Sequence, residues 1–110
     1  MYAGSLPPTS IYNTWIENIE LSSADDGGLV DLSTVDDIQV KLLDPETRFE
    51  ELKLTLSHGD VTLPSLGIIQ WRAAQTQMAT LFPKFYEVLI LLIDAGDTTT
   101  LALGNISIVE

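Results

Sequence analysis

The amino-acid sequence predicts an all-β fold, and three observations support that prediction. Apolar and polar residues alternate along several short segments, as they do in strands with one buried face. Gly, Asp and Pro interrupt these segments roughly every eight to twelve residues, as in β-sandwiches. Strand-length and helix-length patterns do not alternate, which argues against a parallel sheet. We therefore expect an antiparallel immunoglobulin-like β-sandwich of about seven or eight strands.

The chain has 110 residues, a length that suits one domain. Residues 1–10 (MYAGSLPPTS) are predicted to form an N-terminal arm, because one Gly and two Pro oppose regular structure there. The arm is either a frayed terminus or a segment that becomes ordered on a partner through Tyr2 and Leu6. Residues 11–110 are assigned to a single β-sandwich domain.

The first half of the chain is expected to form strands separated by two turn-forming stretches. The expected strands are 11–21, 37–43, 51–57 and 61–63, and a short strand at 29–32 is compatible with the pattern. The turn-forming stretches are SSADDGG at 22–28 and DPET at 44–47. In the predicted strand at 37–43, the even-numbered positions are apolar and share one face. Leu43 lies on the opposite face of the strand.

The second half of the chain has the clearest pattern. Its predicted elements are a strand at 68–72, a short helical turn at 73–81, a strand at 85–93, a turn at 94–97, and strands at 98–103 and from 106 onward. Trp71 is expected inside the core together with Ile69. The turn at 94–97 predicts a hairpin. A bulge or bend is expected at Gly104–Asn105, where the alternation is interrupted.

The strand at 85–93 is apolar on both faces apart from Glu87. One face of a strand in an antiparallel sandwich usually meets water and is polar. If Val88, Ile90 and Leu92 face the core, three large apolar residues lie outside it. Covering each of them stabilises the protein by roughly 1.5–3 kcal/mol. The cover is either another segment of this chain or a second subunit. On the second interpretation, the partner interface consists of Tyr2, Leu6, Leu43, Leu89, Leu91 and Ile93.

The composition excludes several classes of function. Five Lys and Arg against sixteen Asp and Glu give a net charge of −11, which disfavours DNA and RNA binding. Cys is absent, so no disulfide, thiolate metal site or catalytic thiol is expected. The longest apolar run is too short to cross a membrane, and residues 1–10 do not resemble an export signal.

Few residues could carry chemistry. Ser57, His58 and Asp60 are close in sequence, but a catalytic triad gathers its members from separate segments, so we expect a solvated hairpin tip there. Acidic pairs such as Asp36–Asp37 and Asp94/Asp97 fall in predicted turns, where Asp bonds nearby backbone amides. A cation in these turns is an open alternative. We predict no catalytic residues, cofactor, metal site or small-molecule substrate.

Several motifs occur in a fixed order along the last three-quarters of the chain. They are DPET at 44–47, Ile-x-Trp at 69–71, Thr-Leu-Phe-Pro at 80–83, Tyr-x-Val-x-Ile at 86–90, the turn at 94–97, and Leu-x-Leu-Gly-x-Ile-x-Ile-Val at 101–109. In this respect the chain resembles a group of small bacteriophage virion proteins. Lys84 departs from that group, in which Gly commonly follows the Pro. The resemblance implies an immunoglobulin-like sandwich associated with phage tails, baseplates or necks, and no catalytic residues.

We therefore expect a structural virion protein of a bacteriophage, in the tail or baseplate, made in the host bacterial cytoplasm. Its expected partners are other virion proteins and copies of itself, with no nucleic acid and no membrane. The alternative is a carbohydrate- or host-receptor-binding β-sandwich module, with Tyr2, Tyr12 and Trp15 as candidate exposed aromatic residues. Mimicry of DNA is a third hypothesis, and it requires carboxylates in an ordered row.

Overall fold

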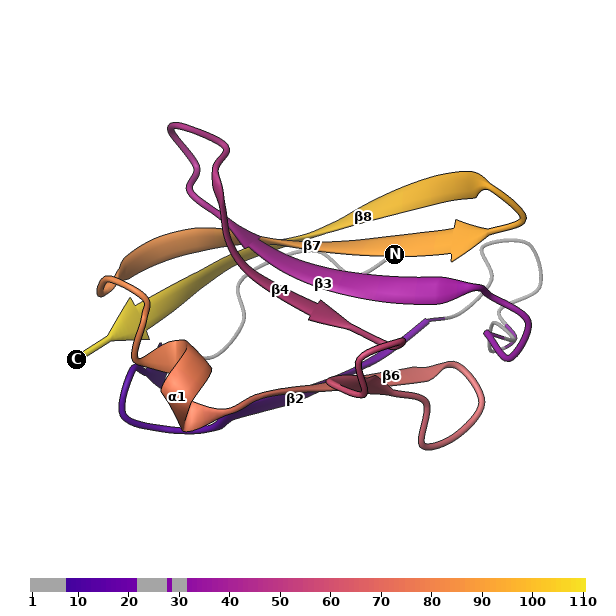
Figure 1. Cartoon of the computed structure of the whole chain (residues 1–110), viewed down its shortest axis with the longest axis horizontal. Helices are drawn as coiled ribbons and strands as arrows, with labels where there is room; N and C mark the ends of the chain where they lie inside the picture. Colours follow the sequence, from indigo (N-terminus) through magenta and orange to yellow (C-terminus); the bar gives the residue numbers. More distant parts are fainter. Residues whose placement is uncertain (1–7, 22–27, 29–31) are drawn as a thin grey trace.

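The computed structural model describes residues 8–21, 28 and 32–110, and these residues are mostly β-strand (Figure 1). The elements are β1 (Thr9–Ser10), β2 (Trp15–Glu20), β3 (Asp37–Leu43), β4 (Glu50–Thr55), β5 (Val61–Thr62), β6 (Ile68–Ala73), α1 (Gln75–Met78), β7 (Lys84–Asp94) and β8 (Asp97–Val109). The predicted all-β class is confirmed. The expected strand at 29–32 lies outside the described residues apart from Leu32, which is in no strand. Within the described part, no helix has the length and hydropathy needed to cross a membrane.

Strands β1, β8, β7, β3 and β4 form, in that order, the larger of two sheets. Neighbouring strands are antiparallel, except that β1 runs parallel to β8 with Thr9 opposite Ile108. The sheet therefore includes Thr9 and Ser10, the last two residues of the predicted arm. Backbone pairing holds this short strand, and such pairing leaves no hydropathy signal in the sequence. Residues 1–7 of the arm lie outside the described residues.

The smaller sheet has the order β2, β6, β5, and its neighbouring strands are antiparallel. β2 is shorter than the strand predicted at 11–21, because the chain makes a turn before Trp15. Ser10 stabilises that turn. Its Oγ accepts a hydrogen bond from the Tyr12 backbone N–H, and its carbonyl oxygen accepts one from Asn13.

The two sheets face each other across one hydrophobic core (Figure 1). Trp15 of β2 and Trp71 of β6 are both buried, and their rings meet edge to face with centroids 5.7 Å apart. Ile69 and Trp71 both face the core, as predicted. From the larger sheet, the fully buried side chains include Ile38 and Ile90.

Strands β7 and β8 form the predicted hairpin. Asp94 pairs with Asp97 around Ala95 and Gly96, which both have positive φ (51° and 87°). This two-residue loop matches the right-handed twist of the strands that it joins. The register then shifts beside Gly104, whose φ is 106°, so the predicted bulge is confirmed.

The short helix α1 connects the smaller sheet to the larger one, where a helical turn was expected from the sequence. The Gln77 side chain accepts a 2.8 Å hydrogen bond from the Ala74 backbone N–H, and Met78 is fully buried. Figure 1 places α1 at the same end of the molecule as the β3–β4 hairpin and the C-terminus, and the β7–β8 turn at the opposite end.

Candidate partner-binding surfaces

Strand β7 carries the apolar residues that the sequence predicts outside the core. Val88 and Ile90 are fully buried and alternate with Leu89 and Leu91, so the predicted facing of this strand is confirmed. Leu89, Leu91 and Ile93 are half-buried rather than exposed. The reason is that β7 lies in the middle of its sheet, where β3 and β8 flank each of its side chains.

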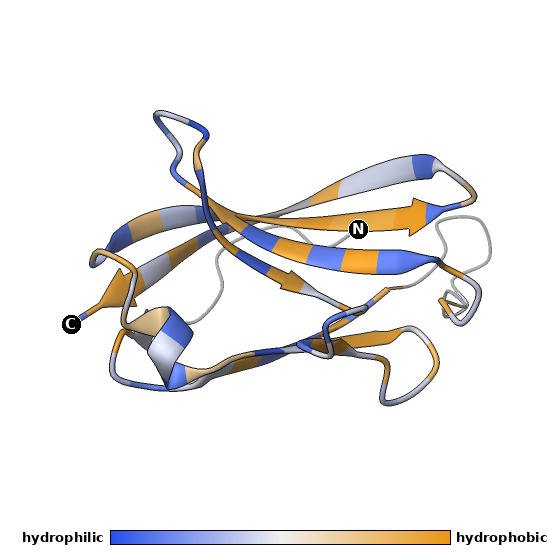
Figure 2. Ribbon diagram, in the orientation of Figure 1, coloured by the Kyte–Doolittle hydropathy of each residue, from blue (hydrophilic) through white to orange (hydrophobic). Residues whose placement is uncertain are grey.

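Polar residues of the adjacent strands narrow this apolar stripe. Leu91 lies between Gln39 of β3 and Thr100 of β8, and Leu89 lies beside Lys41. Figure 2 shows β7 as hydrophobic along most of its length, next to a β3 that alternates in hydropathy. The stripe is thus a single row of half-buried apolar side chains, and its role as a partner interface stays a prediction.

Leu43 is not an exposed extension of the stripe. It lies opposite Glu87 and is only 8% exposed. The ion pair between Arg48 and Glu87 brings the β3–β4 hairpin close to the same place, and the low exposure shows that the chain itself covers Leu43. The other two predicted anchors, Tyr2 and Leu6, lie outside the described residues.

Exposed aromatic side chains form a second candidate surface, which the hydropathy pattern did not predict. Phe49, Phe82 and Phe85 are all the phenylalanines of the protein, and they are 63%, 76% and 64% exposed. Tyr12 is 65% exposed. Trp15, in contrast, is 2% exposed, so the expectation that it presents an aromatic face to a sugar is wrong.

These aromatic residues lie at one end of the molecule. The Asp44 backbone N–H donates to the Phe49 carbonyl oxygen, and the Asp44 carboxylate forms an ion pair with Lys84, the first residue of β7. The turn after β1 reaches the same end, because the Ile11 N–H donates to the carbonyl oxygen of Val109 near the end of β8. We call this region the aromatic end and define it by Tyr12, Phe49, Phe82 and Phe85.

The loop that carries Phe82 is anchored although the Phe82 ring is exposed. The Tyr86 hydroxyl donates a 2.8 Å hydrogen bond to the Phe82 carbonyl oxygen, and the preceding Leu81 is buried. Burial raises the pKa of the Tyr86 hydroxyl, which therefore stays protonated as a donor at neutral pH. Pro83 restricts the backbone on the other side. The ring is thus presented to solvent on a backbone with little freedom.

Ion pairs compensate much of the charge near the aromatic end. The pairs are Lys84–Asp44, Arg48–Glu87 and Lys41–Glu50. They use three of the five basic residues of a protein with a net charge of −11. Such exposed pairs contribute little to stability. Their main consequence is that Lys41, Arg48 and Lys84 are each already paired with a carboxylate.

The Asp44 carboxyl is expected to titrate well below the ordinary range. Hydrogen bonds from the Lys84 ammonium and from the backbone N–H groups of Glu46 and Thr47 lower its pKa from 3.8 to about 2. These bonds therefore stabilise the fold fully when the pH is above 3.8, the ordinary pKa of the group. The stabilisation is lost as the pH falls through about 2. An NMR titration of the carboxyl carbon measures this value directly. Lys84→Met should raise the pKa of Asp44, and an unchanged value would contradict the ion pair.

The opposite end of the molecule is acidic. Asp94 and Asp97 are exposed at the β7–β8 turn, and Asp36 precedes β3. The Asp36 carboxylate accepts a 2.9 Å hydrogen bond from the Ala95 N–H, so it stabilises the turn, as expected for Asp in such a place. We call this region the acidic end. Segments that meet there contain no Lys or Arg: 32–36, 63–67 and 94–97.

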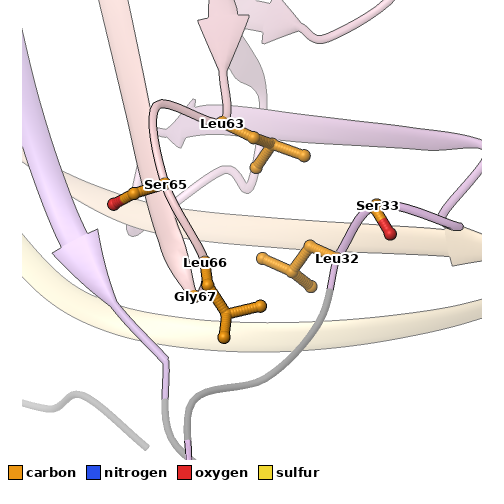
Figure 3. Close-up of a pocket in the computed structure, with 6 residues that line it drawn as sticks. All are labelled: Leu32, Ser33, Leu63, Ser65, Leu66 and Gly67. Atoms are coloured by element: carbon orange, nitrogen blue, oxygen red, sulfur yellow. The ribbon is translucent and has the colours of Figure 1, made fainter.

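An apolar pocket of about 290 Å³ opens at the acidic end, between the β5–β6 loop and the segment before β3 (Figure 3). Its lining residues are Leu32, Ser33, Leu63, Ser65, Leu66 and Gly67. Leu66 is 55% exposed at its rim, whereas Leu32 is buried. The Leu21 N–H donates a 2.8 Å hydrogen bond to the Gly67 carbonyl oxygen and so ties the loop to the end of β2.

Among the described residues no strand pairs with the outer edge of β2, and a charged residue protects that edge. Glu17 alternates with the exposed Ile16 and Asn18, which places it on the core side together with Trp15. Burial raises the pKa of the Glu17 carboxyl. An inward-pointing carboxylate on an edge strand opposes pairing with another chain. This edge is therefore unsuited to strand addition.

Ser57, His58 and Asp60 do not form a catalytic relay. His58 Nδ1 lies 3.1 Å from the Asp60 carboxylate, but the Ser57 hydroxyl lies 3.4 Å from both Asp37 and Thr55. The His58 side chain is 78% exposed, so nothing excludes water from it. Among the described residues, no group of three or more His, Asp or Glu could hold a metal ion.

No protein-family model matches the chain, and no curated protein sequence matches it. Among solved structures, the chain is similar to the endo-β-1,4-mannanase from Thermotoga petrophila, with a TM-score of 0.57 and 14% sequence identity. The likeness covers 94% of this chain and 18% of the mannanase chain, so this chain spans less than a fifth of that protein. At this level of identity, the likeness shows a shared fold and nothing about activity.

Proposed function

We propose that this protein is a structural component of a bacteriophage virion, in the tail or baseplate, and acts through contacts with other virion proteins and with copies of itself. The proposal assigns it no catalytic role and no nucleic-acid or membrane partner. It is made in the host cytoplasm and carried in the particle. The aromatic end is the observation that carries the proposal, because exposed large aromatic side chains are typical of a protein-binding surface.

We further propose that the fold is immunoglobulin-like. Two features support this assignment. The larger sheet has the order β1-β8-β7-β3-β4 against a smaller sheet β2-β6-β5, an arrangement compatible with a seven- to nine-strand immunoglobulin sandwich. The bond from the Tyr86 hydroxyl back to the Phe82 carbonyl oxygen resembles the tyrosine corner of that architecture. Such sandwiches serve widely as binding and assembly modules, so the fold agrees with the proposed role without specifying it.

The alternative is a module that binds a carbohydrate or a host receptor. The exposed aromatic rings favour it as well, since Tyr12 and the three phenylalanines could stack on a ligand. The absence of a tryptophan from this surface makes it a weaker fit. A glycan array separates the two functions, because the structural component is expected to bind no glycan.

The proposed function is tested in particles purified from a culture that produces the protein. We expect the chain to co-purify with the particles through a density gradient. Lysine-directed cross-linking should then join Lys84, which directly precedes Phe85, to other particle proteins more often than Lys53, which lies in β4 opposite Lys41. Presence in the lysate but absence from the particles would contradict the proposal.

A further inference from the structure

We propose that two copies of this chain pair through the outer edge of β8, with the two strands antiparallel and Thr100 of one copy opposite Thr100 of the other. The pairing joins the larger sheets of the two copies into one continuous sheet. This inference rests on the proposed function in one respect, because it specifies one of the contacts between copies that the function requires.

Most of the outer edge of β8 is open. β1 pairs only with Ile108 and Val109 at the end of β8, and among the described residues no other strand lies beside β8 on that side. The open stretch runs from Asp97, at the β7–β8 turn, to the bulge at Gly104, along the rim of the larger sheet (Figure 1). Such an edge presents a row of backbone groups to which another strand can add.

The register of the β7–β8 hairpin determines which residues present these groups. The residues that flank a two-residue hairpin loop form a hydrogen-bonded pair, which here is Asp94 with Asp97. Because the bonds alternate along an antiparallel pair of strands, the odd-numbered residues in this part of β8 direct their backbone groups toward β7. Thr98, Thr100 and Ala102 therefore direct their N–H and C=O groups to the outer edge.

The other long edges of the two sheets carry charged residues, whereas this edge does not. β4 has Glu50, Glu51 and Lys53, and β2 has Glu17 on its core side. Such charges oppose the addition of a strand. Residues 98–109, in contrast, contain no Asp, Glu, Lys, Arg or Pro, although the chain has a net charge of −11. The edge of β8 can thus receive a strand without opposing a charge.

A second copy of β8 matches this edge symmetrically. With Thr100 opposite Thr100, Thr98 of each copy lies opposite Ala102 of the other, so every residue that directs its backbone outward meets another such residue. Thr98 and Thr100 are also exposed, so their side chains are available for cross-strand contacts. Threonine favours strands, and pairs of threonines across two strands stabilise a sheet.

The antiparallel arrangement also keeps the acidic turns of the two copies apart. Asp97 of one copy lies opposite Leu103 of the other, so the two Asp97 residues are separated by about 20 Å along the strands, at about 3.4 Å per residue. Charges at that separation are largely screened, because the Debye length is about 8 Å at physiological ionic strength. A parallel pairing in register places the acidic turns side by side, so the charges favour the antiparallel arrangement.

The pairing is complete with two copies. In this register, Gly96 of the second copy lies opposite Gly104, so the second hairpin ends before it reaches β1 beside Ile108. Both copies use the same edge, and a contact of this isologous kind closes as a two-fold dimer. We therefore expect a dimer rather than an open-ended fibre.

Thr100→Lys and Thr100→Asp test the contact in sedimentation velocity over a range of concentrations. Thr100 is exposed, so both variants should stay folded, and circular dichroism checks this. Each variant alone places like charges opposite one another on the two-fold axis and should weaken dimerisation by about tenfold or more. An equimolar mixture places opposite charges there and should restore a 1:1 dimer. Thr62→Lys, at an exposed position in β5, is the matched control and should leave dimerisation unchanged.

Hydrogen exchange of the unchanged chain locates the contact without any substitution. In the dimer, the amides of Thr98 and Thr100 should be protected, whereas on dilution to the monomer they should exchange quickly. The amides of Thr99 and Leu101 face β7 and should be protected in both states. Fast exchange at Thr98 and Thr100 in the dimer would overturn the inference, because the copies would then meet through another surface. Undiminished dimerisation of folded Thr100→Lys alone would overturn it as well.

A chain that remains monomeric at all concentrations also overturns the inference. Protection of Thr98 and Thr100 in that monomer would assign the edge to another segment of the same chain. A monomer leaves the proposed function to its own test, because co-purification with particles can depend on other virion proteins. Conversely, absence from the particles together with a dimer protected at Thr98 and Thr100 would reject the virion role and retain the pairing through β8.

Discussion

Trp71→Ala is expected to lower the free energy of unfolding by about 3–5 kcal/mol, the usual cost of removing a large buried aromatic side chain. Trp71 is fully buried in β6, the central strand of the smaller sheet, and its ring packs edge to face on Trp15. Truncation removes this contact and leaves a cavity between the sheets. Domains of this size are stable by only about 5–15 kcal/mol, so the variant should be near the limit of folding.

Phe82→Ala is the matched control, since it also truncates a large aromatic residue. Phe82 is 76% exposed, so its loss should change the stability by no more than about 0.5 kcal/mol. Urea denaturation followed by circular dichroism measures both variants. Equal losses in the two variants would show that the assignment of Trp71 to the core and Phe82 to the surface is wrong.

The strands that alternate in hydropathy could be predicted from the sequence. In β7, Val88 and Ile90 lie inside and Leu89 and Leu91 outside, as the period-two pattern requires. The turn at 94–97 was also predictable, because Gly96 supplies the positive φ that a two-residue hairpin loop needs. These features depend on local chemistry alone.

Features that depend on tertiary contacts could not be predicted in this way. The pairing of Thr9 with Ile108 uses backbone groups from the two ends of the chain. Leu43 has the hydropathy and the facing of an exposed stripe residue, but it is only 8% exposed beside Glu87, which forms an ion pair with Arg48 of the β3–β4 hairpin. Neither contact has a signature in the local sequence.

The candidate binding surface was missed for a similar reason. Hydropathy alone gives no reason to expect phenylalanine outside the core when tryptophan lies inside. The available signal was position: Phe49 and Phe82 lie in connecting segments rather than in strands, and Phe82 is followed by Pro83. Large aromatic residues outside strands in a β protein are a reason to examine the ends of the fold, in addition to its faces.

Ile90→Asp and Leu91→Asp, a pair of adjacent substitutions on β7, should have opposite outcomes. Ile90 is fully buried beneath the smaller sheet, so Asp at that position removes a core side chain and buries a carboxyl group with no partner. The loss of the side chain alone costs about 2–5 kcal/mol, and the buried carboxyl adds more. We expect Ile90→Asp to be unfolded at neutral pH by circular dichroism.

Leu91→Asp should remain folded, because Leu91 lies on the outer side of the same sheet between Gln39 and Thr100. The substitution should lower the free energy of unfolding by about 1 kcal/mol, which is the span of side-chain preferences measured in strands. The folded variant then tests the predicted interface: loss of co-purification with particles would assign the stripe of Leu89, Leu91 and Ile93 to a partner. Normal co-purification would remove the stripe as an interface and leave the aromatic end as the candidate surface. An unfolded Leu91→Asp would show instead that Leu91 belongs to the core.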